Sequence, residues 1–138
     1  MQVIIFTNDN GGVATTIPTG EISIDAVLEK DVPKGRGARI VNYTDLPLAY
    51  NDFYDAWEMT DTTVQVNMDK AKELTKARLR AEREPLLQAQ DVAFQRALET
   101  GADTSAIVAE KQRLRDITKL VDNVNTVEEL KSLEVTNG

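Results

Sequence analysis

The stretch RAEREPLLQAQ, residues 80–90, places a proline in the most charged and most helix-favouring part of the chain. A proline inside a helix costs about 3 kcal/mol or more, because its ring clashes with the preceding turn and it has no N–H to donate. At the first position of a helix the same residue is favoured, and it disfavours helical backbone angles at the residue before it, here Glu84. Pro85 therefore either interrupts one long helix or begins a new one.

The apolar pattern on the two sides of Pro85 indicates that a new helix begins there. The preceding segment carries a thin apolar stripe, consisting of Met68, Ala71, Leu74, Ala77, Leu79 and Ala81. The following segment carries a wider apolar face, which contains Leu86, Leu87, Ala89, Val92, Ala93, Phe94, Ala97 and Leu98. We therefore predict a helix over residues 68–83 and a second, more deeply buried helix that begins at Pro85, after a sharp bend or a change of direction. The alternative is that the second helix continues the first with a kink.

A third helix is predicted to run back along the second. Gly101 suits the left-handed cap that ends a helix, and one of the residues Asp103, Thr104 and Ser105 can cap the next. Two helices joined by so few residues must pack antiparallel, so residues 85–122 are predicted to form an αα-hairpin. The side chains expected to be packed in this hairpin are Leu86, Leu87, Phe94, Leu98, Ile107, Leu114, Ile117 and Val121. The sequence TVEE, residues 126–129, matches a capping box and predicts a short last helix over 127–133, before a loose tail.

The front half of the chain has the pattern of a β-rich domain. A strand over residues 2–7 leads into NDNGG, residues 8–12, which is a strong turn signal, and a returning strand follows. Ser23 can cap a short helix, and further strands are predicted over residues 38–42 and 63–66. The predicted fold class is α+β, with an acidic β-rich domain over residues 1–66 and a helical region over 67–138.

Aromatic residues are concentrated in one segment. Five of the seven lie between positions 43 and 57, namely Tyr43, Tyr50, Phe53, Tyr54 and Trp57. In the first interpretation they form a small core that lacks aliphatic bulk. In the second, Tyr50, Phe53, Tyr54 and Trp57 form an exposed patch that binds a partner protein.

The charge is distributed unevenly. Residues 1–66 carry ten acidic and four basic residues, a net charge of −6, which argues against binding to nucleic acid. Residues 70–83 carry six basic and two acidic residues, a net charge of +4. This run is either a solvated helix face or a docking surface for an acidic partner, such as the front half of a neighbouring copy. The candidate docking residues are Lys70, Lys76, Arg80 and Arg83.

The composition excludes several kinds of chemistry. The chain contains no cysteine and no histidine, so disulfides, Cys/His zinc sites and histidine-assisted nucleophiles are impossible. The glycine-rich points at residues 11–12 and 34–37 match no phosphate-binding loop and read as turns. Asp52 and Asp55 are the best-placed carboxylate pair, but nothing in the sequence indicates a catalytic role for them. We expect no enzyme activity, no metal and no cofactor.

The first ten residues, MQVIIFTNDN, contain only a four-residue apolar run and no basic segment before it. They match neither a signal peptide nor a membrane span. We therefore expect a soluble protein that is made in the cytoplasm and does not enter a membrane.

Two series of residues carry a resemblance to a known group of proteins. The first is KDVP…RIV…DLP…DAWE at residues 30–58, and the second is PLL…RALETG…KQRLRD at residues 85–116. Over nearly its whole length, the chain resembles small proteins encoded among the tail and tail-fibre genes of tailed bacteriophages. It departs from the expected pattern at Gln90, where an apolar residue would suit the helical face better. The segment KQRLRDIT, residues 111–118, also resembles tail-fibre assembly proteins.

This resemblance implies a non-enzymatic protein that is used in multiple copies, made in the host cytoplasm and located in the virion. One hypothesis is a structural or adaptor protein in the tail or fibre-attachment region, with other phage structural proteins as partners. The alternative is a tail or tail-fibre assembly chaperone that is absent from the mature particle. The thin stripe over residues 68–81, the small side chains of Ala71, Ala77 and Ala81, and the opposite charges of the two halves favour a homo-oligomer. The resemblance to fibre-region proteins favours a trimer.

Overall fold

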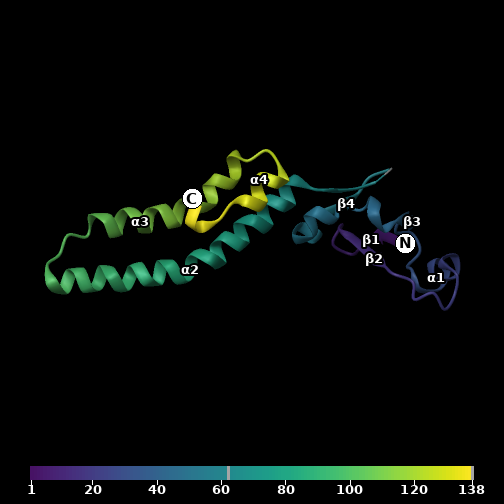
Figure 1. Ribbon diagram of the computed structural model, residues 1–138, viewed down its shortest axis with the longest axis horizontal. Coiled ribbons are helices and arrows are strands. Elements are labelled where there is room, and N and C mark those ends of the chain that lie inside the picture. The colour runs from purple at the N-terminus through teal and green to yellow at the C-terminus, as the bar shows by residue number, and fades with distance from the viewer. Residues whose placement is uncertain (62, 138) are drawn as a thin grey trace. The chain divides into compact units, whose positions relative to one another are not determined.

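A computed structural model describes residues 1–61 and 63–137 of the 138-residue chain. The chain divides into two compact units, unit 1 (Met1–Ala71) and unit 2 (Lys72–Gly138). Antiparallel strands near the N-terminus precede a helical C-terminal half, and helices hold 59% of the chain against 15% for strands. The predicted α+β fold class is therefore confirmed (Figure 1).

Unit 1 is built on a three-stranded antiparallel sheet. Its strands are β1 (Gln2–Thr7), β2 (Val13–Thr16) and β3 (Arg39–Asn42), in the order β2-β1-β3. The predicted hairpin between β1 and β2 is confirmed. Its turn is closed by the Asn8 side chain, whose Oδ1 accepts hydrogen bonds from the N–H groups of Asn10 and Gly12, both at 2.9 Å. Gly11 supplies the positive φ of 79° that this turn requires.

Both faces of this sheet are covered, because successive residues of β1 point to opposite sides. Val3 and Ile5 pack with Trp57 and Val64, which belong to a second hairpin made of β4 (Trp57–Met59) and β5 (Val64–Val66). On the other face Ile4 packs with residues of helix α1 (Ile24–Asp31) and of the loop that follows it. Two short 3₁₀ helices, η1 (Tyr43–Asp45) and η2 (Leu48–Ala56), connect β3 to β4.

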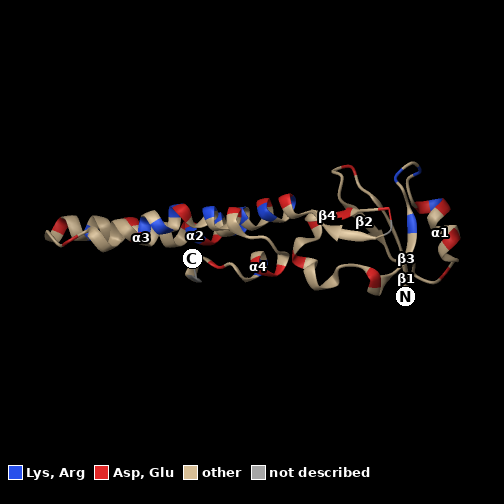
Figure 2. Cartoon of the chain, turned by 90° about the horizontal axis from the view of Figure 1, so that it is seen from above, with Lys and Arg blue, Asp and Glu red and all other residues tan. Residues whose placement is uncertain are grey.

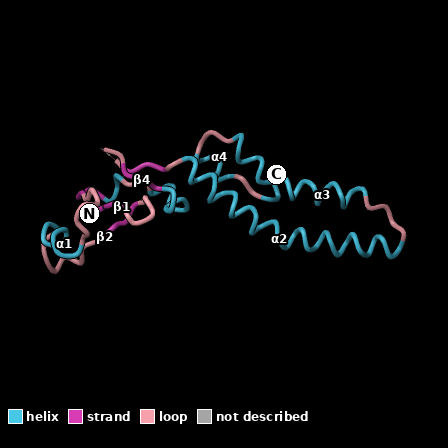
Figure 3. Tube along the Cα trace, turned by 180° about the vertical axis from the view of Figure 1, so that it is seen from behind, coloured by secondary structure: helices cyan, strands magenta, loops and turns pink. Residues whose placement is uncertain are grey.

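The longest helix, α2 (Met68–Thr100), contains Pro85 near its middle. The predicted end of one helix before Pro85 and the start of another at it are therefore wrong. Figures 1 and 3 show that α2 bends near its middle and continues, which is how a helix accommodates a proline in its interior. Pro85 is exposed, so its ring occupies no space at the packed face of the helix, and packing along both halves of α2 offsets its local cost.

The predicted αα-hairpin is confirmed. The second half of α2 and helix α3 (Ser105–Asp116) run antiparallel side by side (Figures 1 and 3). The turn is a Schellman motif, in which Gly101 has a φ of 69° and Ala102 N–H donates to the Ala97 carbonyl at 2.8 Å. Leu87, Phe94 and Ile107 are half-buried and Leu114 is fully buried. Leu86 and Leu98, which were predicted to be packed, are exposed instead, because contact between two helices covers only a narrow stripe of each.

After α3 the chain folds back along the first half of α2. A 3₁₀ helix, η3 (Ile117–Asn123), buries Ile117 and Val121 where the sequence predicted that the helix continues to residue 122. Helix α4 (Val127–Ser132) begins at Thr126, whose Oγ1 accepts the Glu129 N–H at 3.2 Å, as predicted. The predicted loose tail is wrong at Val135, which is buried and begins the 3₁₀ helix η4 (Val135–Asn137).

Candidate functional site

The basic side chains along α2 are the first candidate site (Figure 2). Lys76 Nζ lies 2.9 Å from Asp122 Oδ1 and 3.8 Å from Glu73 Oε1. The hydrogen bond from Lys76 lowers the pKa of Asp122, and the positive charge of Lys72 adds a smaller effect. Lys76 therefore joins α2 to the end of η3 within unit 2.

Arg83 binds the C-terminal end of α3. Its Nη1 donates to the carbonyl oxygens of Leu114 and Arg115, at 3.3 and 2.9 Å. The last four carbonyls of a helix have no partner within the helix, and they lie at the negative end of its dipole. The Leu114 carbonyl also accepts the Ile117 N–H, so the guanidinium group of Arg83 adds a charged donor there and supplies one to the Arg115 carbonyl.

Two further arginines hold the C-terminal segments of unit 2. Arg78 Nη2 donates to the carbonyls of Leu130 and Leu133 at the end of α4, at 3.4 and 2.5 Å. Arg113 donates to the Val135 carbonyl at 2.8 Å and to both carboxylate oxygens of Glu110, at 2.7 and 3.0 Å. Hydrogen bonding between these two side chains lowers the pKa of Glu110 and raises that of Arg113.

These contacts show that the basic side chains of α2 do not form one free surface. Lys76 and Arg83 are engaged by the segments that fold back onto α2, and their binding to an acidic partner stays a prediction. Lys70 belongs to unit 1, where it is half-buried beside Gly11. Arg80 is exposed and makes no hydrogen bond or ion pair with the residues that the structure describes. Nothing in the sequence showed that Arg83 and Arg78 bind main-chain carbonyls 31 and 55 positions away.

The aromatic segment forms part of the core of unit 1. Trp57 and Phe53 are only 1% and 5% exposed, so the interpretation as a recognition patch is wrong for both. Trp57 Nε1–H donates to the Tyr50 carbonyl at 3.2 Å, and the ring of Tyr54 lies 4.8 Å from that of Trp57 with a tilt of 56°. Tyr50 and Tyr54 are half-buried. The alternative interpretation, in which the aromatic residues belong to a core, is confirmed for Phe53 and Trp57. That core is not short of aliphatic bulk, because Val3, Val13 and Leu46 are among the residues buried in it.

The remaining candidates from the sequence are distributed without a common centre. Asp52 and Asp55 are both exposed on η2. Glu58 instead has a structural role, since hydrogen bonds from Asn67 and Gln65, each at 2.9 Å, lower its pKa and fix Asn67 as the cap of α2. Within residues 1–61 and 63–137, no three acidic side chains gather closely enough to hold a metal ion.

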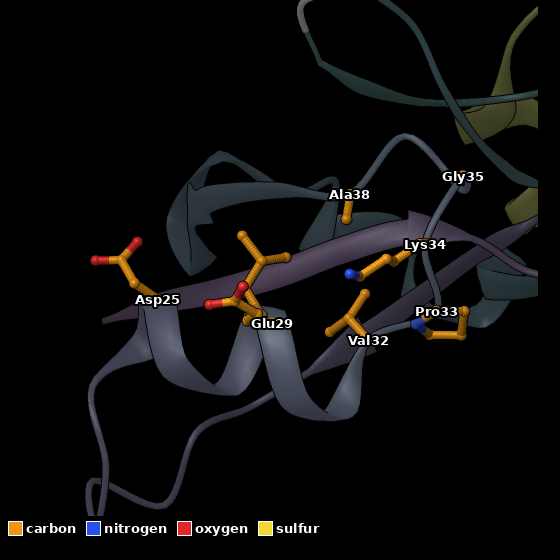
Figure 4. Close-up of a pocket in the computed structure, with 8 residues that line it drawn as sticks. Asp25, Glu29, Val32, Pro33, Lys34, Gly35 and Ala38 are labelled. Carbon is orange, nitrogen blue, oxygen red and sulfur yellow. The ribbon is translucent and has the colours of Figure 1, made fainter.

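Unit 1 also contains an open pocket of about 430 Å³ between α1 and the loop that follows it. Figure 4 shows Asp25 and Glu29 on α1 and Lys34 on the loop, around an apolar wall that includes Val32 and Pro33. This pocket could not be predicted from the sequence, because apolar residues in a short helix are equally typical of a core. The apolar wall and the charged residues around it suit an apolar side chain of a bound protein that has a charged residue next to it.

One side of the hairpin carries large apolar side chains, of which Leu98 and Val108 are exposed and Leu87 and Phe94 are half-buried. Helical spacing places Leu87, Phe94 and Leu98 on one side of α2, and Val108 lies on the same side of α3 as Lys111. Lys111 Nζ lies 2.7 Å from Asp91 Oδ1 and 5.1 Å from the centre of the Phe94 ring, which brings the two helix sides into one surface. We call the surface made by Leu87, Phe94, Leu98 and Val108 the hairpin face.

The stripe over residues 68–81, from which association was predicted, is largely covered within the chain. Ala71 and Leu79 are fully buried, and so is Thr75, a polar residue that the apolar pattern did not reveal. Ala77 and Ala81 are exposed. The larger exposed apolar side chains of α2 lie further along it, at Leu86, Val92 and Leu98, and Leu98 is the one that belongs to the hairpin face.

Comparisons of the chain with protein-family models, with curated proteins and with solved structures found no match. None of the helices described over residues 1–61 and 63–137 combines the length and the apolar character that a membrane crossing requires.

Proposed function

We propose that this protein is a non-enzymatic structural or adaptor protein of a tailed-bacteriophage particle, located in the tail or the tail-fibre attachment region. The sequence resemblance at residues 30–58 and 85–116 supports the class of protein. The structural observation that carries the proposal is the hairpin face, where Leu98 and Val108 are 58% and 51% exposed. Large apolar side chains gathered on one surface are typical of a site that binds another protein.

In this proposal the protein works by contacts with other phage structural proteins and with copies of itself, and it performs no reaction. We propose a homo-oligomer, with three copies as the number, in keeping with fibre-region proteins. The arginine contacts of unit 2 suit such a role, because they fix the ends of α3 and α4 and so present the hairpin from a rigid base.

The alternative function is an assembly chaperone that binds a tail or fibre protein and leaves before the particle is complete. The observation that favours it is the resemblance of residues 111–118 to tail-fibre assembly proteins. These residues lie in α3 and the start of η3, and Lys111 among them borders the hairpin face. As a chaperone, the protein would bind its transient partner through the same surface that a structural protein would use for a permanent partner.

Mass spectrometry of gradient-purified particles and of the lysate from which they came distinguishes the two functions. A virion protein is expected in the particles at a constant ratio to the major capsid protein through successive purification steps. A chaperone is expected in the lysate and lost from the particles. If the gene is expressed but its peptides are found neither in particles nor in complexes with phage proteins, both proposed functions are refuted.

A further inference from the structure

Strand β3 forms one edge of the sheet in unit 1, with β1 as its neighbour. The N–H of Tyr43, directly after β3, donates to the Met1 carbonyl at 2.8 Å. Hydrogen-bonded pairs alternate with unbonded pairs along an antiparallel ladder, so every second residue back from Tyr43 directs its N–H and C=O groups toward β1. The intervening residues, Ile40 and Asn42, direct theirs outward, and these groups have no hydrogen-bond partner among residues 1–61 and 63–137. The edge therefore offers main-chain donors and acceptors that another strand can bind.

The pocket beside α1 adjoins this edge. Ala38, which immediately precedes β3, lines the pocket. Ala38 and Ile40 both pack with Ile4, on the face of the sheet that α1 covers. A strand added along β3 would direct alternate side chains to this face. One of those side chains would then lie at the pocket, against the apolar wall that includes Val32 and Pro33.

The charged side chains of the pocket are not balanced within the chain. Asp25 and Glu29 lie one turn apart on α1, and Lys34 lies on the loop side of the pocket (Figure 4). In the part of the chain that the structure describes, none of the three forms an ion pair. Arg36, further along the same loop, is paired with Asp9. The lining therefore carries two carboxylates against one ammonium group, and it favours a positively charged side chain on a bound segment.

We propose that β3 and the pocket beside α1 form a groove that binds an extended segment of a partner protein, in which an apolar residue has a lysine or arginine two positions away. The segment adds to the sheet as a strand next to β3, so that main-chain hydrogen bonds supply affinity and the pocket selects the side chain. This inference rests on the partner-binding part of the proposed function and gives the chemistry of the partner. A second copy of unit 1 fits the groove less well, because residues 1–66 carry a net charge of −6 and two copies repel each other.

The first test measures binding of a fluorescent peptide to the full chain by anisotropy. The peptide consists of seven residues, with leucine at its centre, arginine two positions to either side, and threonine elsewhere. Saturable binding is expected. Replacing both arginines of the peptide by glutamate should weaken binding on the order of tenfold, and replacing the leucine by alanine should weaken it as well. If the three peptides bind equally, or none binds at millimolar concentration, the inference is wrong.

Asn42→Pro tests the strand addition itself. Asn42 is exposed and has a φ of −74°, which proline adopts without strain. Its N–H points away from β1, so proline at this position removes an outward donor and leaves the ladder intact, as prolines on edge strands do. Binding of the arginine peptide should fall on the order of tenfold or more, while Asn42→Ala, which keeps the N–H, should bind as wild type does. Unchanged circular dichroism would show that both variants fold, and equal binding by the two would overturn the inference.

Neutralising the carboxylates tests the charge preference. Asp25→Asn combined with Glu29→Gln should weaken binding of the arginine peptide by roughly threefold or more and should not weaken binding of the glutamate peptide. The matched control is Asp52→Asn combined with Asp55→Asn, which removes the same charge from η2 and should leave binding unchanged. Equal losses in the two double variants would contradict a local role for the pocket.

Light scattering distinguishes a second copy from a partner protein. A wild-type dimer that Asn42→Pro dissociates would assign the edge to another copy of the chain and overturn the inference. Particle mass spectrometry tests the proposed function separately. A protein that is present in particles but binds none of the peptides would retain the function and lose this groove.

Discussion

Replacing Pro85 by alanine is expected to stabilise unit 2. Residue 85 lies in the interior of α2 with its side chain exposed, so alanine would restore a hydrogen bond to the Ala81 carbonyl without disturbing packing. Alanine is favoured over proline in a helix interior by about 3 kcal/mol. The greater flexibility of the unfolded alanine chain offsets about 0.4–1 kcal/mol of this, and the bend in α2 already relieves part of the clash. The net gain in the free energy of unfolding is expected to be about 1–2 kcal/mol.

Urea unfolding followed by circular dichroism measures this gain. With a dependence of about 1–3 kcal/mol per molar urea, the midpoint should rise by roughly 0.3–2 M. Fluorescence provides a second probe, because Trp57 and all three tyrosines belong to unit 1, and the transition that they report should change little. Gln95→Ala, at another exposed position of α2, controls for helix propensity and should change stability by less than about 0.5 kcal/mol.

If Pro85 instead begins a separate helix, Pro85→Ala should not increase the free energy of unfolding. At the first helical position proline is favoured, since its φ is already suitable and its missing N–H would have no partner. Pro85→Ala would then leave the midpoint unchanged or lower it. A lower midpoint for Pro85→Ala, with Gln95→Ala unchanged, would refute the continuous helix.

Side chains that hold unit 2 together should show graded losses of stability. Leu114→Ala should lower the free energy of unfolding by about 2–5 kcal/mol, because the side chain is fully buried and its truncation leaves a cavity; a wild-type urea midpoint would contradict this. Arg83→Met should cost about 1–2 kcal/mol through the lost helix cap, whereas Arg80→Met should stay within about 0.5 kcal/mol in the same urea assay; equal effects would contradict the capping role. Because Arg113 lowers the pKa of Glu110 in the folded state, the contribution of Glu110 to stability should be present above its ordinary pKa of 4.5 and lost as the pH falls through the lowered value. Glu110→Gln should therefore flatten the loss of stability in acid, and an unchanged pH profile would be evidence against the pair.

Features with a local cause could be predicted from the sequence. Ser23 and Thr126 each cap a helix as expected, and Gly101 ends one, because the groups that they bind lie within five positions along the chain. The hairpin at residues 8–12 forms for the same reason. In each case the hydrogen-bond partner could be identified in the sequence itself.

Features that depend on distant packing could not be predicted. The cost of Pro85 is local, but the contacts that offset it come from segments beyond residue 105, so the local signal gave the wrong answer. Leu98 has the spacing of a buried residue and is exposed, because spacing does not show whether a covering element exists. Lys76 and Arg83 looked like surface charges because their partners, at positions 114–122, were not recognisable as such in the sequence.

The arginine contacts of unit 2 have a consequence for which positions can be substituted during evolution. Arg78 and Arg83 bind main-chain carbonyl oxygens, and every amino acid carries one. Arg115 and Leu133 can therefore be exchanged for other residues without removing the oxygen that is bound, provided that the backbone keeps its path. The guanidinium groups have no such freedom, since no other side chain offers the same fork of donors. Substitutions should accordingly be tolerated at Arg115 and Leu133 and be rejected at the two arginines that bind their carbonyls.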